Sequence, residues 1–148
     1  MKPKNLKDFV RESNMIENIH REPSEYEIEA TADFLCLEQI TVPSLEHLVS
    51  VYAPGNVLRR EVGRNVVVGN HVAPRGGPAI EPMLDYLLAR INTHLLHPYQ
   101  GHCEYETLHP FTDGNGRSGR AVWLWAMQGE APLGFLHHWY YQSLQNLR

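Results

Sequence analysis

Apolar residues recur at a spacing close to 3.6 over most of the chain, which predicts a mainly helical protein. Short turn-rich stretches with proline, glycine or asparagine separate the periodic segments. The helices are predicted at about 6–18, 23–40, 43–52, 81–96, 98–108, 121–127 and 136–147.

Two of these helices have recognisable beginnings. Ser24 followed three residues later by Glu27 has the pattern of a capping box, and Ser44 is predicted to cap the third helix. Helical spacing also predicts which apolar side chains face the core. They are Ile28, Phe34, Leu35 and Leu37 in the second helix, and Met83, Leu84, Leu87, Leu88 and Ile91 in the fourth.

The segment 53–80 has a different pattern and is rich in glycine, proline and asparagine. Within it, "NVVVG" at 65–69 is the best strand of the chain because β-branched residues favour extended backbone. "VLRREV" at 57–62 is predicted to pair with it as a hairpin. The fold class expected is therefore mainly α with one small β-hairpin.

Composition narrows the class of protein. The chain has 148 residues, 43% hydrophobic and 20% charged, which suits one soluble domain. Its net charge of −4 argues against bulk nucleic-acid binding. The N-terminal segment lacks the apolar core of a signal peptide, and no run reaches the ~20 apolar residues of a membrane span. Cys36 and Cys103 are predicted to be reduced thiols, so a cytoplasmic protein without membrane contact is expected.

The most unusual stretch is "HPFTDGNGRSGR" at 109–120. It satisfies G-x-G-x-x-G but lacks the strands and the later acidic residue of a dinucleotide fold. It has no lysine for a P-loop, and Leu124 stands where a calcium loop needs glutamate. A zinc set drawn from His97, His102, Cys103 and His109 lacks paired ligand spacing.

An anion site explains this stretch better. A helix that opens near Asn115 would present the backbone N–H groups of Gly114, Asn115 and Gly116 to an anion. The arginines at 117 and 120 are three residues apart, so both guanidinium groups are expected to reach the same polyphosphate. Asp113 is placed to hold a phosphate-bound divalent cation, and His109 is the group able to take a proton near neutral pH.

The whole stretch resembles the signature of the Fic family, His-x-Phe-x-Asp/Glu-Gly-Asn-Gly-Arg-x-x-Arg, and matches every fixed position. The preceding "HCEYETLHPF" is similar to the family's approach helix, and a looser resemblance extends from about Val57 to Leu144. Most Fic enzymes transfer AMP from ATP to a hydroxyl group of a target protein. The resemblance thus implies a Fic-type helical bundle with a hairpin flap.

The resemblance also implies roles for individual residues. His109 would be the general base, Asp113 would hold Mg²⁺, and Phe111 would anchor the loop in the core. ATP phosphates would bind Gly114, Asn115, Gly116, Arg117 and Arg120. Tyr141, in "WYYQSL", would lie against the adenine. The strand residues Val66, Val67 and Val68 would form the flap that docks the target by β-augmentation.

A second stretch, "SNMIEN" at 13–18, matches the family's inhibitory pattern Ser/Thr-x-x-x-Glu-Gly/Asn through Ser13, Glu17 and Asn18. In relatives with this helix at the N-terminus, the glutamate pairs with the second arginine of the signature, which here is Arg120. That pairing would keep Arg120 from the γ-phosphate of ATP. The resemblance therefore implies inhibition in cis.

The expected function is that of a protein adenylyltransferase acting on Ser, Thr or Tyr hydroxyl groups, with self-modification as one outcome. Two alternatives stay open: removal of AMP from a modified protein, with Glu17 positioning water, and a nucleotide-binding module with little catalysis. The expected organisation is one Fic domain over 1–148, with an inhibitory helix at 1–20, a flap hairpin at 57–72 and a helical core at 78–148.

Overall fold

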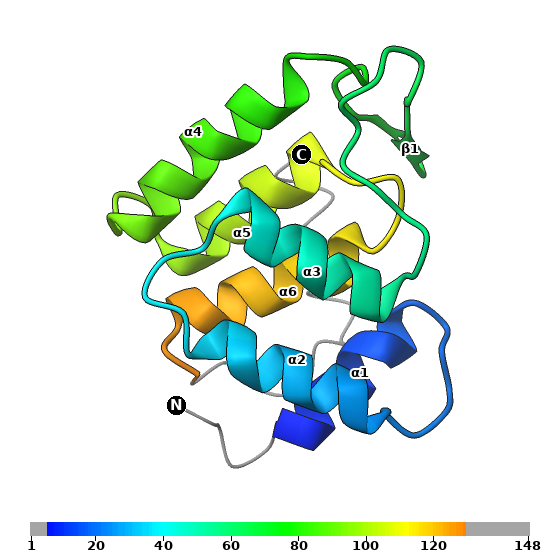
Figure 1. The fold of residues 1–148 in the computed structure, drawn as a ribbon, viewed down its shortest axis with the longest axis vertical. Helices are drawn as coiled ribbons and strands as arrows, with labels where there is room; N and C mark the ends of the chain where they lie inside the picture. Colours follow the sequence, from blue (N-terminus) through cyan, green and yellow to red (C-terminus); the bar gives the residue numbers. More distant parts are fainter. Residues whose placement is uncertain (1–5, 130–148) are drawn as a thin grey trace.

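The computed structural model describes residues 6–129, and this part of the chain folds into six helices and one two-stranded hairpin (Figure 1). The predicted helix at 136–147 and Tyr141 lie outside the described residues. The mainly α fold with a small hairpin is confirmed. In chain order the elements are α1 (Leu6–Ile16), α2 (Glu25–Leu35), α3 (Val42–Tyr52), β1 (Val67–Val68), β2 (His71–Val72), α4 (Ile80–Asn92), α5 (Pro98–Leu108) and α6 (Asn115–Ala126).

The helix that follows the glycine-rich loop, α6, is the centre of the fold. It contacts α1, α2, α3 and α5, whereas α4 packs on the far side of α5 (Figure 1). Its second half is apolar and buried, through Ala121, Val122, Trp123 and Leu124. This burial ties the glycine-rich loop to the core, so the loop is held by packing rather than by local propensity.

The helix starts follow local rules, with one correction. Ser24 and Glu27 form the predicted capping box of α2. Ser44 was predicted to cap α3, but it is the third residue of this helix. Thr41 is the N-cap, and the two hydroxyl groups accept hydrogen bonds from each other's backbone N–H groups. Two hydroxyl residues three positions apart suit both ends of such a box, so the sequence alone placed the start too late.

The hairpin differs from the one predicted. Val67 and Val68 pair with Val72 and His71, not with "VLRREV". The latter segment instead runs beside the glycine-rich loop, where Leu58 forms an antiparallel bridge with Phe111. A tight two-residue turn through Gly69 (φ 58°) and Asn70 joins the two strands.

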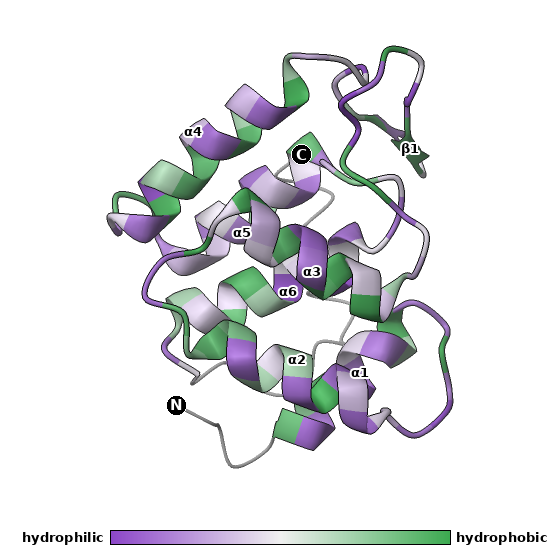
Figure 2. Cartoon of the chain, in the orientation of Figure 1, coloured by the Kyte–Doolittle hydropathy of each residue, from purple (hydrophilic) through white to green (hydrophobic). Residues whose placement is uncertain are grey.

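The apolar stripe of α4 is confirmed at Leu84, Leu87, Leu88 and Ile91, which are all buried. Met83 was wrongly assigned to it and is 43% exposed, because it lies at the flank of the stripe. Figure 2 shows hydrophobic residues on the hairpin, away from the helical core. Val62, Val67 and Val72 of this region are all more than half exposed. None of the described helices has the length and apolarity needed to cross a membrane.

Candidate functional site

The N-terminus of α6 has the features of an anion site. Its N-cap, Gly114, has φ 82° and offers no side chain to cap the helix. The backbone N–H groups of Asn115, Gly116 and Arg117 donate to no residue in 6–129. Uncapped N–H groups at the positive end of a helix favour an anion. We call these three N–H groups the cradle.

Asn115 fixes the loop before the cradle. Its side-chain amide accepts a hydrogen bond from the Phe111 N–H and donates one to the Phe111 carbonyl, each at 2.8 Å. Phe111 is fully buried, which confirms that it anchors the loop in the core. The side-chain amide of Asn115 therefore shapes the loop, and its backbone N–H is the group that could bind an anion.

His109 follows the last residue of α5 and has a left-handed backbone (φ 50°, ψ 63°). This conformation is uncommon outside glycine and often occurs at functional sites. The ring Nδ1 lies 3.1 Å from the Glu106 carbonyl oxygen. A carbonyl only accepts, so Nδ1 carries a proton, and a neutral ring in this position has its lone pair on Nε2. This is the tautomer that a general base requires.

Asp113 is an exposed carboxylate directly before the cradle. Its Oδ1 accepts a hydrogen bond from the Gly114 N–H at 2.7 Å. The prediction that this N–H is free to bind an anion is therefore wrong, and it is not part of the cradle. The described residues hold no cluster of three or more His, Cys, Asp or Glu side chains suited to a metal ion. One carboxylate beside a phosphate site nevertheless fits Mg²⁺, which usually takes one or two carboxylates together with phosphates.

Arg120 is buried and bound to α1. Its Nε donates to the Ser13 hydroxyl at 2.7 Å and its Nη2 to the Ser13 carbonyl at 3.0 Å. The same Nη2 lies 2.9 Å from Oε1 of Glu17. Arg120 is 2% exposed at its side chain and Glu17 37%. The ion pair expected from the sequence is thus present, across 103 residues of chain.

The Glu17 carboxylate lies directly against the cradle. A Cβ atom added at Gly116 would overlap Oε1 of Glu17 and crowd the Arg120 guanidinium. Residue 116 must therefore lack a side chain for the carboxylate to reach this position. The negative group of the residue that follows α1 thus lies beside the N–H groups that would bind an anion.

The geometry of α1 explains the spacing of "SNMIEN". Ser13 and Glu17 are one turn apart, so both reach Arg120. Asn18 has a left-handed backbone (φ 61°) and ends the helix, and the Ile19 N–H bonds back to the Asn14 carbonyl. Glycine and asparagine are the residues that favour this conformation.

A buried carboxylate on α2 holds α1 in place. Glu27 accepts hydrogen bonds from the Asn14 amide, from both terminal nitrogens of Arg21 and from the Ser24 N–H. Burial alone would raise the pKa of Glu27, but the hydrogen bonds of Arg21 and Ser24 outweigh it and lower this pKa to about 2. An ionised Glu27 therefore ties together α1, the following loop and the start of α2.

Arg117 and Arg120 were predicted to reach the same anion, but in the structure their guanidinium groups bind different elements. Arg117 Nη1 donates to the Tyr52 carbonyl at 2.8 Å, and the Arg117 guanidinium lies over the Tyr52 ring. Residues three apart share a helical face, but both α3 and α1 contact α6, and each binds one of the two arginines. The buried Nε of Arg117 has no hydrogen-bond partner among the described residues.

Arg59 was not predicted from the sequence. This arginine is fully buried, and its guanidinium donates to the carbonyls of Leu108, His109, Arg64 and Pro74. It thus joins the end of α5 to the segment that carries the hairpin. No motif marks it in "VLRREV", where an adjacent arginine is exposed; a buried arginine is recognisable only in the structure.

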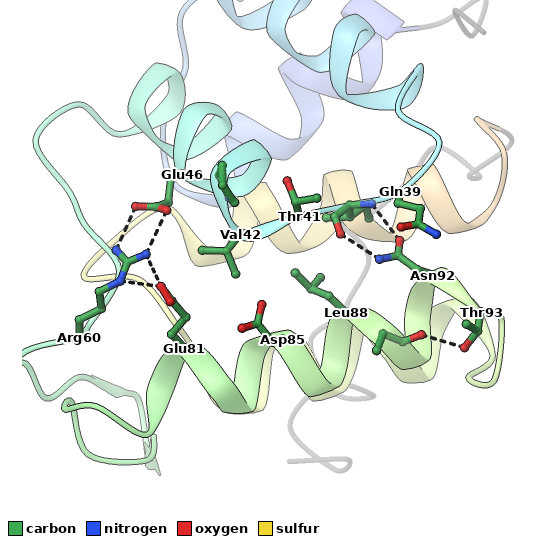
Figure 3. Close-up of a pocket in the computed structure, with 13 residues that line it drawn as sticks. Gln39, Thr41, Val42, Glu46, Arg60, Glu81, Asp85, Leu88, Asn92 and Thr93 are labelled. Atoms are coloured by element: carbon green, nitrogen blue, oxygen red, sulfur yellow. Dashed lines mark hydrogen bonds and ion pairs between the residues drawn. The ribbon is translucent and has the colours of Figure 1, made fainter.

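A polar pocket lies elsewhere, between α3 and α4 (Figure 3). Arg60 bridges Glu46 and Glu81 there, and Asn92 exchanges two hydrogen bonds with the backbone of Ile40. No residue of 109–120 lines this pocket. It is therefore separate from the cradle.

Comparison with known families identifies the chain. The sequence profile of the Fic/DOC family matches residues 16–127, which include the whole glycine-rich stretch. The chain belongs to the Fic/DOC family. Proteins of this family are generally transferases that use ATP, commonly with Mg²⁺, and membership is consistent with transfer of AMP. A comparison with curated proteins gives no match.

Proposed function

We propose that this Fic/DOC protein transfers AMP from ATP to a hydroxyl group of a target protein and that α1 inhibits the transfer. One observation supports this most strongly: a histidine whose Nδ1 donates to a carbonyl ends α5, and the loop after it leads directly into the uncapped N-terminus of α6. The first group can remove a proton and the second can hold phosphates. Together they suit the two needs of phosphoryl-type transfer, positioning and charge neutralisation.

The phosphates of ATP are proposed to bind at the cradle. The N–H groups of Asn115, Gly116 and Arg117 would donate to phosphate oxygens, and the buried Nε of Arg117 offers a further donor. Arg120 would bind the γ-phosphate once it leaves Glu17. Asp113 would hold Mg²⁺ through its second oxygen, and the cation would neutralise phosphate charge.

His109 is proposed to take the proton from the target hydroxyl. The hydroxyl oxygen then forms a bond to the α-phosphorus, the bond between this phosphorus and the bridging oxygen breaks, and pyrophosphate leaves. The proton ends on Nε2, because Nδ1 already donates to the Glu106 carbonyl. Preorganised N–H groups stabilise the charge that develops on the α-phosphate.

The hairpin is proposed to dock the target. Val67 and Val68 are exposed, and among residues 6–129 their short strand pairs with β2 alone. An extended target segment could add to the open edge together with Val66, which precedes it. Tyr141 is kept as the proposed adenine contact, although it lies outside the described residues. A segment of this same chain that reaches the edge would be self-modified.

The proposed inhibition rests on the ion pair between Glu17 and Arg120. As long as Arg120 is bound to Glu17 and Ser13, it is not available to the γ-phosphate. The carboxylate also adds a negative charge beside the cradle, which repels phosphate. ATP would then bind without the α-phosphate facing the hydroxyl.

The role of His109 is tested with His109→Ala in a Glu17→Gly background, with ATP labelled at the α-phosphate. We expect label incorporation to fall by about 10²–10⁴-fold with little change in ATP affinity, because a base acts on the proton and not on the phosphates. His47→Ala, at an exposed histidine of α3, is the matched control. Incorporation at the rate of the Glu17→Gly protein would disprove the assignment of the base.

The same protein distinguishes the alternatives. A carboxylate at the cradle is also suited to position water, so Glu17 favours removal of AMP as the second candidate function. In that case the unsubstituted protein, but not Glu17→Gly, releases label from a previously modified protein. Tight ATP binding without label gain or loss would instead indicate a nucleotide-binding module.

A further inference from the structure

Arg59 is a buried cation whose partners are all backbone carbonyls. Among the described residues no carboxylate pairs with it, and four carbonyl oxygens lie 2.7–2.9 Å from its nitrogens. Burial lowers the pKa of Arg59, yet arginine keeps its charge at physiological pH. Burying a cation without a carboxylate partner costs folding free energy, so the contacts that Arg59 makes indicate its role.

The contacts of Arg59 complete the cap of α5. The last four carbonyls of a helix have no partner within it. At the end of α5 the backbone and the ring of His109 bond the first two, at 2.9 and 3.1 Å. His71 Nε2 bonds the third at 2.8 Å, and Arg59 Nη2 the fourth at 2.9 Å. These carbonyls belong to Tyr105, Glu106, Thr107 and Leu108.

Arg59 also holds the two residues that follow the helix. Its Nε donates to the His109 carbonyl at 2.7 Å, and its backbone N–H donates to the Pro110 carbonyl at 2.9 Å. Its Nη1 reaches the carbonyls of Arg64 and Pro74, on either side of the hairpin. One guanidinium therefore fixes the left-handed backbone of His109 relative to the hairpin.

We propose that Arg59 is a positioning residue which, with His71 as a second contact, holds His109 in register with the hairpin that docks the target. This inference rests on the proposed function, in which His109 is the base and the hairpin docks the target. A target hydroxyl placed by the hairpin must meet Nε2 within a fraction of an ångström. The rigid link through Arg59 sets that distance.

Lysine should not replace this arginine. The planar guanidinium donates in several fixed directions, whereas an ammonium is a point charge with three donors. Arg59→Lys keeps the charge but cannot satisfy four carbonyls on two segments. Arg60→Lys is a matched control, because Arg60 is the neighbouring arginine and bonds carboxylates on the protein surface.

Two readouts test the proposal in the Glu17→Gly background: amide hydrogen exchange without ATP, and initial rates of transfer at varied ATP. For Arg59→Lys we expect at least about tenfold faster exchange at Ala73, Gly77 and His109, whose N–H groups are bonded in this region. We expect kcat to fall by on the order of 10²-fold and KM for ATP to stay within about threefold. Arg60→Lys should change none of these.

His71→Ala keeps the test decisive if Arg59→Lys does not fold, because His71 is only partly buried. It should shift the same readouts in the same direction, with kcat lower by about tenfold. Unchanged exchange and kcat in both variants, or a KM for ATP that accounts for the whole loss, would overturn the proposal.

The proposal and the proposed function fail in different ways. If the Glu17→Gly protein transfers no label at all, the proposed function is wrong. The exchange of the His109 and hairpin amides then still decides whether Arg59 fixes the base and the hairpin as one unit: faster exchange at both supports the link, and exchange unchanged at either refutes it.

Discussion

Removing the Glu17 carboxylate should activate the protein, because it releases Arg120 while leaving this arginine supported. After Glu17→Gly, Arg120 keeps its two hydrogen bonds to Ser13, at 2.7 and 3.0 Å. A buried guanidinium is therefore not left without partners, and the fold should survive. Glu17 follows the last residue of α1, so glycine there costs little helix stability.

The size of the effect follows from the ion pair itself. Fully exposed pairs contribute about 0–1 kcal/mol, and hydrogen bonds to charged groups contribute about 1.5–3 kcal/mol. Here one partner is buried and the other partly exposed, at an N–O distance of 2.9 Å. We therefore expect the pair to be worth about 2 kcal/mol. At 1.36 kcal/mol per factor of ten, its removal should raise the rate of transfer by about 30-fold.

The assay compares initial rates of incorporation from ATP labelled at the α-phosphate. Glu17→Gly and Glu17→Ala should both show the gain, since both remove the carboxylate. Glu17→Gln keeps the shape without the charge and should lie between them and the unsubstituted protein. Glu12→Ala removes a carboxylate within α1 and should leave the rate unchanged.

A double variant checks that the gain passes through the freed guanidinium. Glu17→Gly combined with Arg120→Ala should lose the gain, because the residue proposed to bind the γ-phosphate is absent. Equal labelling by the unsubstituted protein, Glu17→Gly and Glu17→Ala would refute inhibition by α1. The ion pair would then be a structural contact only.

Two further predictions concern the metal and the pH dependence of stability. Asp113→Asn retains an acceptor for the Gly114 N–H but removes the negative charge. Mg²⁺-dependent transfer, measured in a magnesium titration, should therefore fall by on the order of 10²-fold. An unchanged magnesium response would exclude Asp113 as the ligand. The pKa of Glu27 is lowered from 4.5 to about 2, so the stability it gives is complete above pH 4.5 and is lost as the pH falls through about 2. Because Arg21 is half exposed, we expect Glu27→Gln to cost about 2 kcal/mol at pH 7. Unfolding at pH 7, 4.5, 3 and 2 should show this difference vanish in acid; a difference constant over that range would exclude the mechanism.

Much of the fold was predictable from local rules. The helices follow the apolar period, the capping box at Ser24 is present, and the start of α6 at Asn115 follows from the apolar run after it. The failures at Ser44 and Met83 are small, because a cap and the edge of a stripe depend on one or two positions. The pairing of Val67 with Val72 was missed because a two-residue turn can join this strand either to the preceding segment 57–62 or to the following segment 71–72.

The sequence by itself determined the family and the residues proposed for its chemistry, because a long ordered set such as "HPFTDGNGRSGR" carries its spacing within one loop and one helix. Only the tertiary structure decided which partner each charge takes. Arg117 and Arg120 are chemically alike, yet α3 receives one and α1 the other. Arg59 cannot be told from the exposed Arg60 in the sequence, and only the packing of the hairpin segment against the end of α5 buries it. Burial and long-range contacts form only when distant segments pack together, so no local pattern specifies them.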